Sequence, residues 1–201
     1  MRARPAVRAR VRAALLVVDM INAFDYAGGA ALLRHVRRAA PRVAGLRAAF
    51  ALARLPVIYC NDNFGRWRSD FRDAVRRCGA PDAAGADIVA QLRPRPTDYF
   101  VLKPHLSAFF DTPLDLLLRR MRMRHVVLAG IAGDGCIAAT ATDAHMREYR
   151  VTVARDATAS QRSAGNRRAL DQLRVTGTAE LATAATIARA LRRPPARRPR
   201  R

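Results

Sequence analysis

The chain has 201 residues, enough for one domain with a sizeable core, and 50% of them are hydrophobic, which excludes a disordered protein. Its longer apolar runs, such as residues 126–132, are far shorter than the roughly 20 residues that cross a bilayer, so we expect no membrane partner. The formal net charge of +21 raises the question of nucleic-acid binding.

Short apolar runs alternate with segments of helical periodicity along the chain. Residues 13–19, "AALLVVD", form a nearly continuous apolar run that ends in a carboxylate, as expected of a strand buried on both faces. The pattern predicts further strands at residues 56–62, 98–103, 125–132, 150–158 and, weakly, 175–181. It predicts helices at residues 31–55, with a break near Pro41, and at 66–78, 112–123, 134–149, 163–173 and a last one ending near 192.

This alternation of strands and helices predicts a parallel sheet that is covered on both faces. The expected fold class is therefore α/β, a single-domain, three-layer α/β/α sandwich of the Rossmann-like kind with a six-stranded parallel sheet. The three cysteines form neither a disulfide framework nor a CxxC metal pair, so a cytoplasmic location is expected.

Much of the positive charge lies at the two ends of the chain. Residues 1–12 contain five arginines and residues 192–201 contain six, with no acidic residue in either segment. We predict a basic N-terminal tail (1–12), one domain (13–191) and a disordered basic C-terminal tail (192–201). Because no recognised nucleic-acid motif accompanies the charge, we do not expect nucleic acid to be the primary partner.

Three reactive side chains follow different strands of the predicted sheet. Asp19 ends the first strand, Lys103 ends the third, and Cys136 follows the fourth at the start of a helix. Ligands of open parallel sheets bind outside the carboxyl ends of the strands. Each residue alone has an ordinary structural explanation, such as a cap, a surface charge or a small buried hydrophobe. Together they predict one catalytic site.

Lys103 is also the single lysine of the chain, beside 36 arginines. Arginine carries a planar, permanently charged fork, whereas lysine is a compact charge whose pKa can be shifted. We therefore expect position 103 to require an ammonium group.

The chemistry of these groups fits nucleophilic catalysis. A thiol at a helix N-terminus near an ammonium is expected to have its thiolate favoured. The Asp19 carboxylate could take the thiol proton and later return it to a leaving group or activate water. The glycines of "GIAGDGC" let backbone N–H groups approach a substrate, as an oxyanion hole requires. This segment matches neither GxGxxG nor the Walker pattern, so a nucleotide site is disfavoured.

Three segments carry a family resemblance. They are "ALLVVDMINAF" (14–24), "VLKPHLSAF" (101–109) and "VVLAGIAGDGCIAATATDA" (126–144), and they resemble the signature segments of the isochorismatase-like cysteine hydrolases in order and spacing. The resemblance covers residues 13–190 and implies the isochorismatase-like hydrolase fold, whose six-stranded parallel sheet agrees with the strand count above.

The resemblance also implies the roles of particular residues. The catalytic triad would be Asp19, Lys103 and Cys136. A cis peptide bond would lie between Ile131 and Ala132, and would direct the Ala132 N–H, with that of Cys136, at the developing oxyanion.

The chain departs from the family at several positions. Many members have an acid where this chain has Ala23, and a threonine where it has Gly133, a change expected to loosen the cysteine turn. The nicotinamidases bind a metal through an Asp-x-His pair and a further histidine, but the matching stretch 61–67, "NDNFGRW", contains no histidine. The four histidines of the chain are scattered. We therefore expect no metal, no other cofactor and no nicotinamidase activity.

The resemblance limits the substrate without selecting it. Family members cleave the vinyl ether of isochorismate or C–N bonds in amides, carbamoyl compounds and ureides. We expect a hydrolase that acts on a C–N bond other than a peptide bond, with vinyl ether hydrolysis as the alternative. The substrate would be a small molecule, and an anionic one would be favoured by the basic body of the protein. By matching position, the candidate pocket residues are Asn22, Phe24, Asn63, Phe64 and Trp67.

Other interpretations stay open. The aromatic residues among the pocket candidates could equally pack two loops together. The protein could also be a non-catalytic binding protein on this fold, or could associate with nucleic acid through its tails. We also expect a homo-oligomer.

Overall fold

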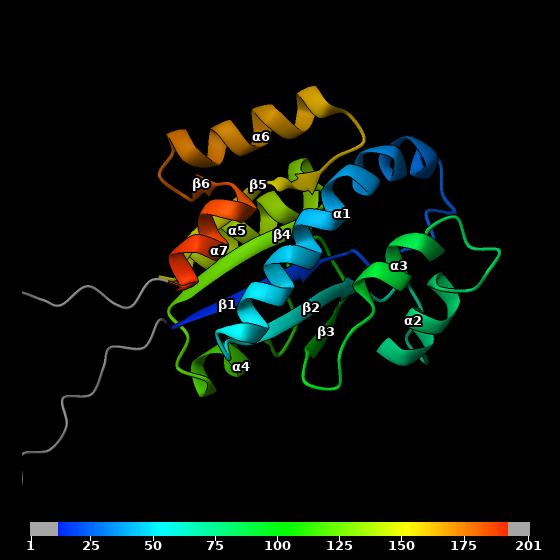
Figure 1. Ribbon diagram of the computed structural model, residues 1–201, viewed down its shortest axis with the longest axis horizontal. Coiled ribbons are helices and arrows are strands. Elements are labelled where there is room, and N and C mark those ends of the chain that lie inside the picture. Colours follow the sequence, from blue (N-terminus) through cyan, green and yellow to red (C-terminus); the bar gives the residue numbers. More distant parts are fainter. Residues whose placement is uncertain (1–11, 193–201) are drawn as a thin grey trace, which may run out of the picture.

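A six-stranded parallel sheet lies between two layers of helices in the computed structural model, which describes residues 12–192 (Figure 1). Every neighbouring pair of strands is parallel, and the spatial order is β3-β2-β1-β4-β5-β6. The order reverses between β1 and β4, which is where open α/β sheets form a crevice for ligands. The predicted fold class is confirmed. The strands are β1 (Ala13–Val18), β2 (Val57–Asp62), β3 (Tyr99–Lys103), β4 (His125–Ile131), β5 (Arg150–Ala159) and β6 (Glu180–Ala182).

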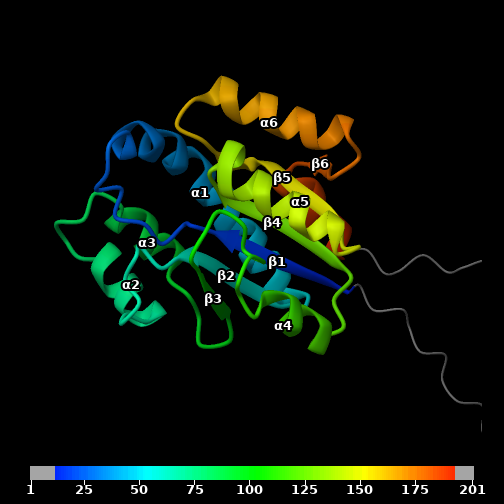
Figure 2. The same ribbon diagram turned by 180° about the vertical axis from the view of Figure 1, so that it is seen from behind.

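The helices divide between the two faces of the sheet. One face is covered by α1, α3 and α7, and the other by α4, α5 and α6, which lie toward the viewer in Figure 2. The helices are α1 (Gly29–Leu52), α2 (Phe71–Cys78), α3 (Ala86–Leu92), α4 (Leu114–Arg120), α5 (Ala138–Met146), α6 (Ser163–Val175) and α7 (Ala184–Arg192).

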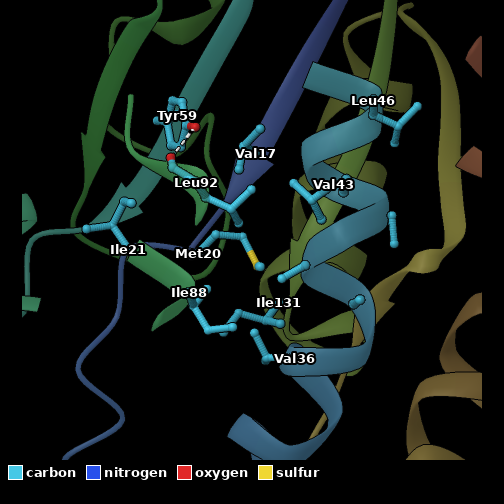
Figure 3. Close-up of a cluster of buried hydrophobic side chains, with 14 of the residues drawn as sticks. Val17, Met20, Ile21, Val36, Val43, Leu46, Tyr59, Ile88, Leu92 and Ile131 are labelled. Carbon is cyan, nitrogen blue, oxygen red and sulfur yellow. Dashed lines mark hydrogen bonds between the residues drawn. The ribbon is translucent and has the colours of Figure 1, made fainter. Parts of the chain in front are cut away.

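Strand β1 contributes to two separate cores because its side chains alternate between the faces. Leu15 and Val17 belong to the core under α1, whereas Leu16 and Val18 belong to the core under α4 and α5. Figure 3 shows the first core, in which side chains of β1 and β4, among them Val17 and Ile131, lie opposite Val36, Val43 and Leu46 of α1. Burying each such side chain contributes roughly 1.5–3 kcal/mol, so β1 is fixed at the centre of the sheet.

Helix α1 runs through Pro41 without a break, and the predicted break is therefore wrong. Pro41 is exposed, whereas Ala40 and Val43 beside it are buried. A proline inside a helix removes one backbone hydrogen bond, but here the buried face packs on the sheet before and after it.

Two other local differences have simple causes. Helix α3 was not predicted, because seven residues between glycine- and proline-containing segments are too few to show a helical period. Helix α4 starts at Leu114 with Pro113 as its N-cap, two residues after the start of the predicted range. The Thr112 hydroxyl still accepts the Leu114 N–H at 3.3 Å.

The tails predicted at the two ends lie outside the described residues, apart from Arg12 and Arg192. The Arg12 carbonyl accepts the N–H groups of Arg124 and His125, at 2.9 and 3.1 Å, and Arg192 is the last residue of α7. Within residues 12–192, no helix is both long and apolar enough to cross a membrane.

His125, the first residue of β4, is partly buried, and its Nε2 lies 2.9 Å from the Thr152 hydroxyl. Burial, assisted by the nearby positive charge of Arg150, lowers the pKa of His125 from 6.5 to about 4. Between these two pH values the unfolded chain binds a proton that the folded protein does not. The contribution of His125 to the free energy of unfolding is therefore fully present above pH 6.5 and is lost as the pH falls toward 4.

We expect His125 to make the protein acid-sensitive. The free energy of unfolding should fall by up to about 3 kcal/mol between pH 7 and pH 4 through this group alone. Urea unfolding at several pH values should show that the free energy of unfolding falls less between pH 7 and pH 4 in His125→Gln than in the wild type. In the matched control His145→Gln, which alters an exposed histidine, it should fall as much as in the wild type. Equal pH dependence in both variants would contradict the assignment.

Candidate active site

The carboxyl ends of β1, β3 and β4 bring Asp19, Lys103 and Cys136 into contact. The Lys103 Nζ lies 3.0 Å from Asp19 Oδ2 and 3.5 Å from Cys136 Sγ. Strand β2 separates β3 from β1, and neighbouring strands are about 4.8 Å apart. The long lysine side chain therefore reaches past β2 to the end of β1, and the three predicted residues form one cluster.

Lys103 is fully buried and surrounded by acceptors. Its ammonium donates to the His105 carbonyl at 3.0 Å and lies 3.9 Å from Asp62 Oδ2, in addition to its contact with Asp19. Burial opposes the charge, but the nearby carboxylates, Asp19 foremost and then Asp62, outweigh it and raise the pKa of Lys103. The ammonium therefore keeps its proton at neutral pH.

Asp19 is held in an unusual backbone conformation. Its φ of 53° lies in the left-handed region, which costs a residue other than glycine about 1–3 kcal/mol. The Asp19 N–H donates to the Cys60 carbonyl at 3.0 Å, and Oδ1 accepts the Asp62 N–H at 2.8 Å. These bonds hold one carboxylate oxygen against β2 and leave the other for Lys103.

The Asp19 side chain is only 9% exposed. Burial raises its pKa, and the Lys103 ammonium opposes that rise. Such a carboxylate is a stronger proton acceptor than an exposed one, as a general base requires.

Cys136 lies in a short π-helical turn, η1 (Gly133–Ile137), between β4 and α5. The N–H groups of Gly135 and Ile137 both donate to the Ala132 carbonyl at 3.0 Å. The peptide bond between Ile131 and Ala132 is cis, as predicted. Gly130 in β4 has a φ of 123°, and a side chain there would meet the Val18 carbonyl at 2.1 Å, so only glycine lets β4 approach β1 this closely.

Gly133 was expected to loosen the cysteine turn, but the space beside it is filled. A Cβ at this position would lie 1.9 Å from Oδ1 of Asn166. That oxygen accepts the Ser160 hydroxyl at 3.0 Å, and the Ser160 oxygen accepts the Asp134 N–H at 3.1 Å. Asn166 and Ser160 thus support the turn from the side of α6.

The surroundings of Cys136 favour the protonated thiol, whereas the sequence led us to expect a favoured thiolate. Burial and the negative charge of Asp19 raise its pKa to about 12, although Lys103 acts in the opposite direction. A thiol with a raised pKa reacts as a nucleophile only after a neighbouring base takes its proton.

The other two cysteines are fully buried, Cys60 within β2 and Cys78 at the end of α2. Burial raises the pKa of both thiols. Cys136 is partly exposed, so it is the cysteine that a substrate can reach.

The five pocket candidates have different surroundings. Asn63 and the 79% exposed Trp67 line a cavity of about 530 Å³ that also includes Asp62 and His105. Phe64 is partly buried, and the Arg77 guanidinium lies 4.5 Å from its ring centre.

The candidates that follow β1 are more buried. Asn22 accepts the Phe24 N–H at 2.8 Å and so shapes the loop. The Phe24 ring belongs to the core and packs against Gly85. The packing interpretation of the aromatic residues therefore fits Phe24 best.

Sequence reasoning missed three residues around the cluster. Asn61 is fully buried, and its side chain both accepts from and donates to the Ile21 backbone, which holds the loop after Asp19. Asp62 supplies the second carboxylate near Lys103. Burial and the charge of Asp19 raise the pKa of Tyr26, so its phenol is within electrostatic reach of that carboxylate. Tyr26 lies two residues after the signature segment, which is the signal that could have identified it.

The residues present do not fit the metal site of the nicotinamidase pattern. Asp62 occupies the position of the metal-binding aspartate, but Phe64 stands where a histidine would be needed, and the Lys103 ammonium already lies beside the Asp62 carboxylate. Across residues 12–192, no three His, Cys, Asp or Glu side chains are grouped as metal ligands.

Known proteins are similar to this chain in sequence and in fold. A family model described as the Isochorismatase domain matches residues 13–186. The uncharacterized isochorismatase family protein YaaI of Bacillus subtilis (strain 168) is 36% identical over 170 residues, 85% of this chain and 93% of the relative. Ureidoacrylate amidohydrolase RutB of Cronobacter sakazakii is 34% identical over 175 residues, 73% of this chain and 74% of the relative.

A solved structure is similar as well. The crystal structure of N-carbamoylsarcosine amidase from Thermoplasma acidophilum is 29% identical and superposes with a TM-score of 0.68, covering 86% of this chain and 96% of the other. The fold and these relatives define a hydrolase built on a parallel α/β sheet. The chain belongs to the isochorismatase family.

We expect the pH dependence of Cys136 alkylation to reflect the raised pKa of its thiol. The rate of alkylation by iodoacetamide should rise about tenfold per pH unit between pH 7 and pH 10, because only the thiolate reacts. In Asp19→Asn the charge that raises the pKa is gone, so alkylation at pH 8 should be faster than in the wild type. Mass spectrometry should locate the label on Cys136, with the buried Cys60 and Cys78 as internal references.

Two results would contradict this picture. A rate that is independent of pH above 7 would mean that the thiolate is already formed. Slower alkylation of Asp19→Asn would mean that Asp19 delivers the thiolate even without substrate.

Proposed function

We propose that the protein is a cysteine amidohydrolase that cleaves a C–N bond in a small N-carbamoyl compound, or ureide, of a carboxylic acid. The observation that carries this proposal is the contact of the Lys103 ammonium with both the Asp19 carboxylate and the Cys136 sulfur. A base, a nucleophile and a fixed positive charge within hydrogen-bonding distance are the elements of nucleophilic acyl transfer.

In the first half-reaction, Asp19 takes the Cys136 proton as the sulfur attacks the substrate carbonyl carbon. The new C–S bond converts the carbonyl to a tetrahedral oxyanion. When this intermediate collapses, the C–N bond breaks and the leaving nitrogen takes the proton from Asp19. The acyl or carbamoyl group then remains on Cys136.

In the second half-reaction, Asp19 takes a proton from water, which attacks the same carbon. The C–S bond breaks, and the sulfur regains the proton from Asp19. Lys103 stays charged throughout, and its ammonium stabilises the negative charge that passes between Asp19 and Cys136.

We assign the oxyanion site to the backbone N–H groups of Ala132 and Cys136. Support comes from turn η1, which contains Cys136 and is held by two hydrogen bonds, from the Gly135 and Ile137 N–H groups to the Ala132 carbonyl. Fixed backbone donors of this kind typically contribute about 3–4 kcal/mol each to the transition state.

The substrate class comes from two of the relatives. Ureidoacrylate and N-carbamoylsarcosine, the compounds in their names, both join a carbamoyl nitrogen to a small carboxylic acid. The cavity beside Asp62 has a volume of about 530 Å³, within the usual range of small-molecule sites. Its lining does not include Cys136, and it meets the cluster at Asp62 and His105, which both contact Lys103. Arg66 lines this cavity and could hold the carboxylate, while Asn63 could bind the ureido group.

Vinyl ether hydrolysis is a second candidate, favoured by the raised pKa of Asp19. A protonated carboxyl could donate its proton to the vinyl carbon, and this reaction requires no covalent bond to sulfur. Cys136 would then be dispensable, which separates the two candidates.

A substrate panel tests the proposal. N-carbamoyl amino acids, simple amides and isochorismate should be assayed for ammonia or product release with the wild type and with Cys136→Ala. We expect hydrolysis of at least one N-carbamoyl acid, and a loss of at least about a thousandfold in kcat/KM on removal of the sulfur. The matched control Cys78→Ala, which alters a buried cysteine away from the site, should keep its activity.

The other outcomes of the panel are informative. Isochorismate hydrolysis that survives in Cys136→Ala would support the vinyl ether reaction instead. Inactivity toward the whole panel would favour a binding protein on this fold.

Lys103→Arg tests whether geometry matters as well as charge. The Lys103 side chain is fully buried, and the larger guanidinium of arginine would form a bidentate pair with the Asp19 carboxylate there. We expect a fall in kcat/KM of about a hundredfold or more, with a folded protein by circular dichroism. Methionine has a shape similar to that of lysine but no charge, so Lys103→Met should also raise the pH at which Cys136 is alkylated. Activity of the arginine variant within a few-fold of the wild type would overturn this role.

A further inference from the structure

A second cavity lies at the carboxyl end of β5, between α1 and the start of α6. In Figure 1 the end of β5 lies between these two helices. Its volume is about 210 Å³, several times that of a water molecule. It shares no lining residue with the cavity beside Asp62. The charged and polar side chains that line it include His35, Arg38, Arg42, Asp156, Asn166 and Arg167.

The charges around this cavity do not balance. Three arginines and a histidine face a single carboxylate, that of Asp156. One oxygen of Asp156 lies 3.5 Å from the Arg42 Nε, and the other accepts the Ala184 N–H at 2.7 Å. Within residues 12–192, Arg38 and Arg167 have no carboxylate within 4.0 Å. The cavity therefore has an excess of positive charge.

The cationic groups come from rigid elements. His35, Arg38 and Arg42 are spaced three and four residues apart, so they lie along one face of α1. Arg167 lies one turn into α6 and faces them across the hollow. Arg42 is fixed by Asp156 and by a hydrogen bond to the Arg38 carbonyl.

The floor of the cavity is also ordered. Ser160 is 1% exposed, and its hydroxyl is bonded to both Asn166 and the Asp134 N–H. Binding a small anion here would require little rearrangement of the protein, which lowers the cost of association.

We propose that this cavity binds inorganic phosphate. Guanidinium forks match phosphate oxygens in pairs, and a dianion would neutralise the excess charge of Arg38 and Arg167. The site is separate from the proposed catalytic cluster and does not depend on which substrate is cleaved.

Titration with inorganic phosphate tests the proposal. The full chain should be titrated by calorimetry at constant ionic strength, with chloride as the balancing anion, because the net charge of +21 attracts all anions. We expect saturable binding with one phosphate per chain. Arg38→Gln/Arg167→Gln should weaken the affinity at least tenfold.

The matched control is Arg34→Gln/Arg168→Gln. It removes the same charge from the same two helices. All four arginines are exposed, but Arg34 and Arg168 lie outside the cavity lining. This variant should bind phosphate as the wild type does. The proposal is wrong if the wild type shows no saturable binding, or if the control variant loses as much affinity as the cavity variant.

Discussion

The buried ammonium of Lys103 is the interaction on which the site depends. A charge with no solvent exposure is costly unless acceptors surround it, and removing one partner of such a pair typically costs about 3–5 kcal/mol. Asp19, Asp62 and the His105 carbonyl supply those acceptors. The ammonium in turn holds the carboxylate beside the sulfur. The same contact thus maintains the structure and lowers the pKa values of the neighbouring carboxyl and thiol against the effect of burial.

The order of the strands produces this contact. Because β1 lies between β2 and β4, the residue that ends it is close both to the lysine arriving from β3 and to the turn that follows β4. The left-handed conformation of Asp19 and its bond to the Asp62 N–H direct the carboxylate toward the Lys103 ammonium. Strain at one residue is tolerated because the buried side chains of β1 fix the backbone before it.

Much of this arrangement could be predicted from the sequence. Continuous apolar runs marked the buried strands, and Asp19, Lys103 and Cys136 were found because reactive side chains followed three of them. The path of α1 through Pro41 was not predictable, since it depends on packing against the sheet. Neither was the raised pKa of Cys136, which depends on how deeply the sulfur is buried and how close Asp19 lies. The arginine-lined cavity joins α1 to α6, which are distant in sequence, so no local pattern could reveal it.

Gly133 and Asn166 have a consequence for how this sequence can diverge. The amide oxygen of Asn166 occupies the place of a side chain at position 133. A larger residue at 133 is compatible with the turn only after position 166 has changed to something smaller or has moved away. The two positions should therefore covary among homologues, because a side chain at 133 forces the Asn166 amide to move and to give up the hydrogen bond that its oxygen accepts from Ser160.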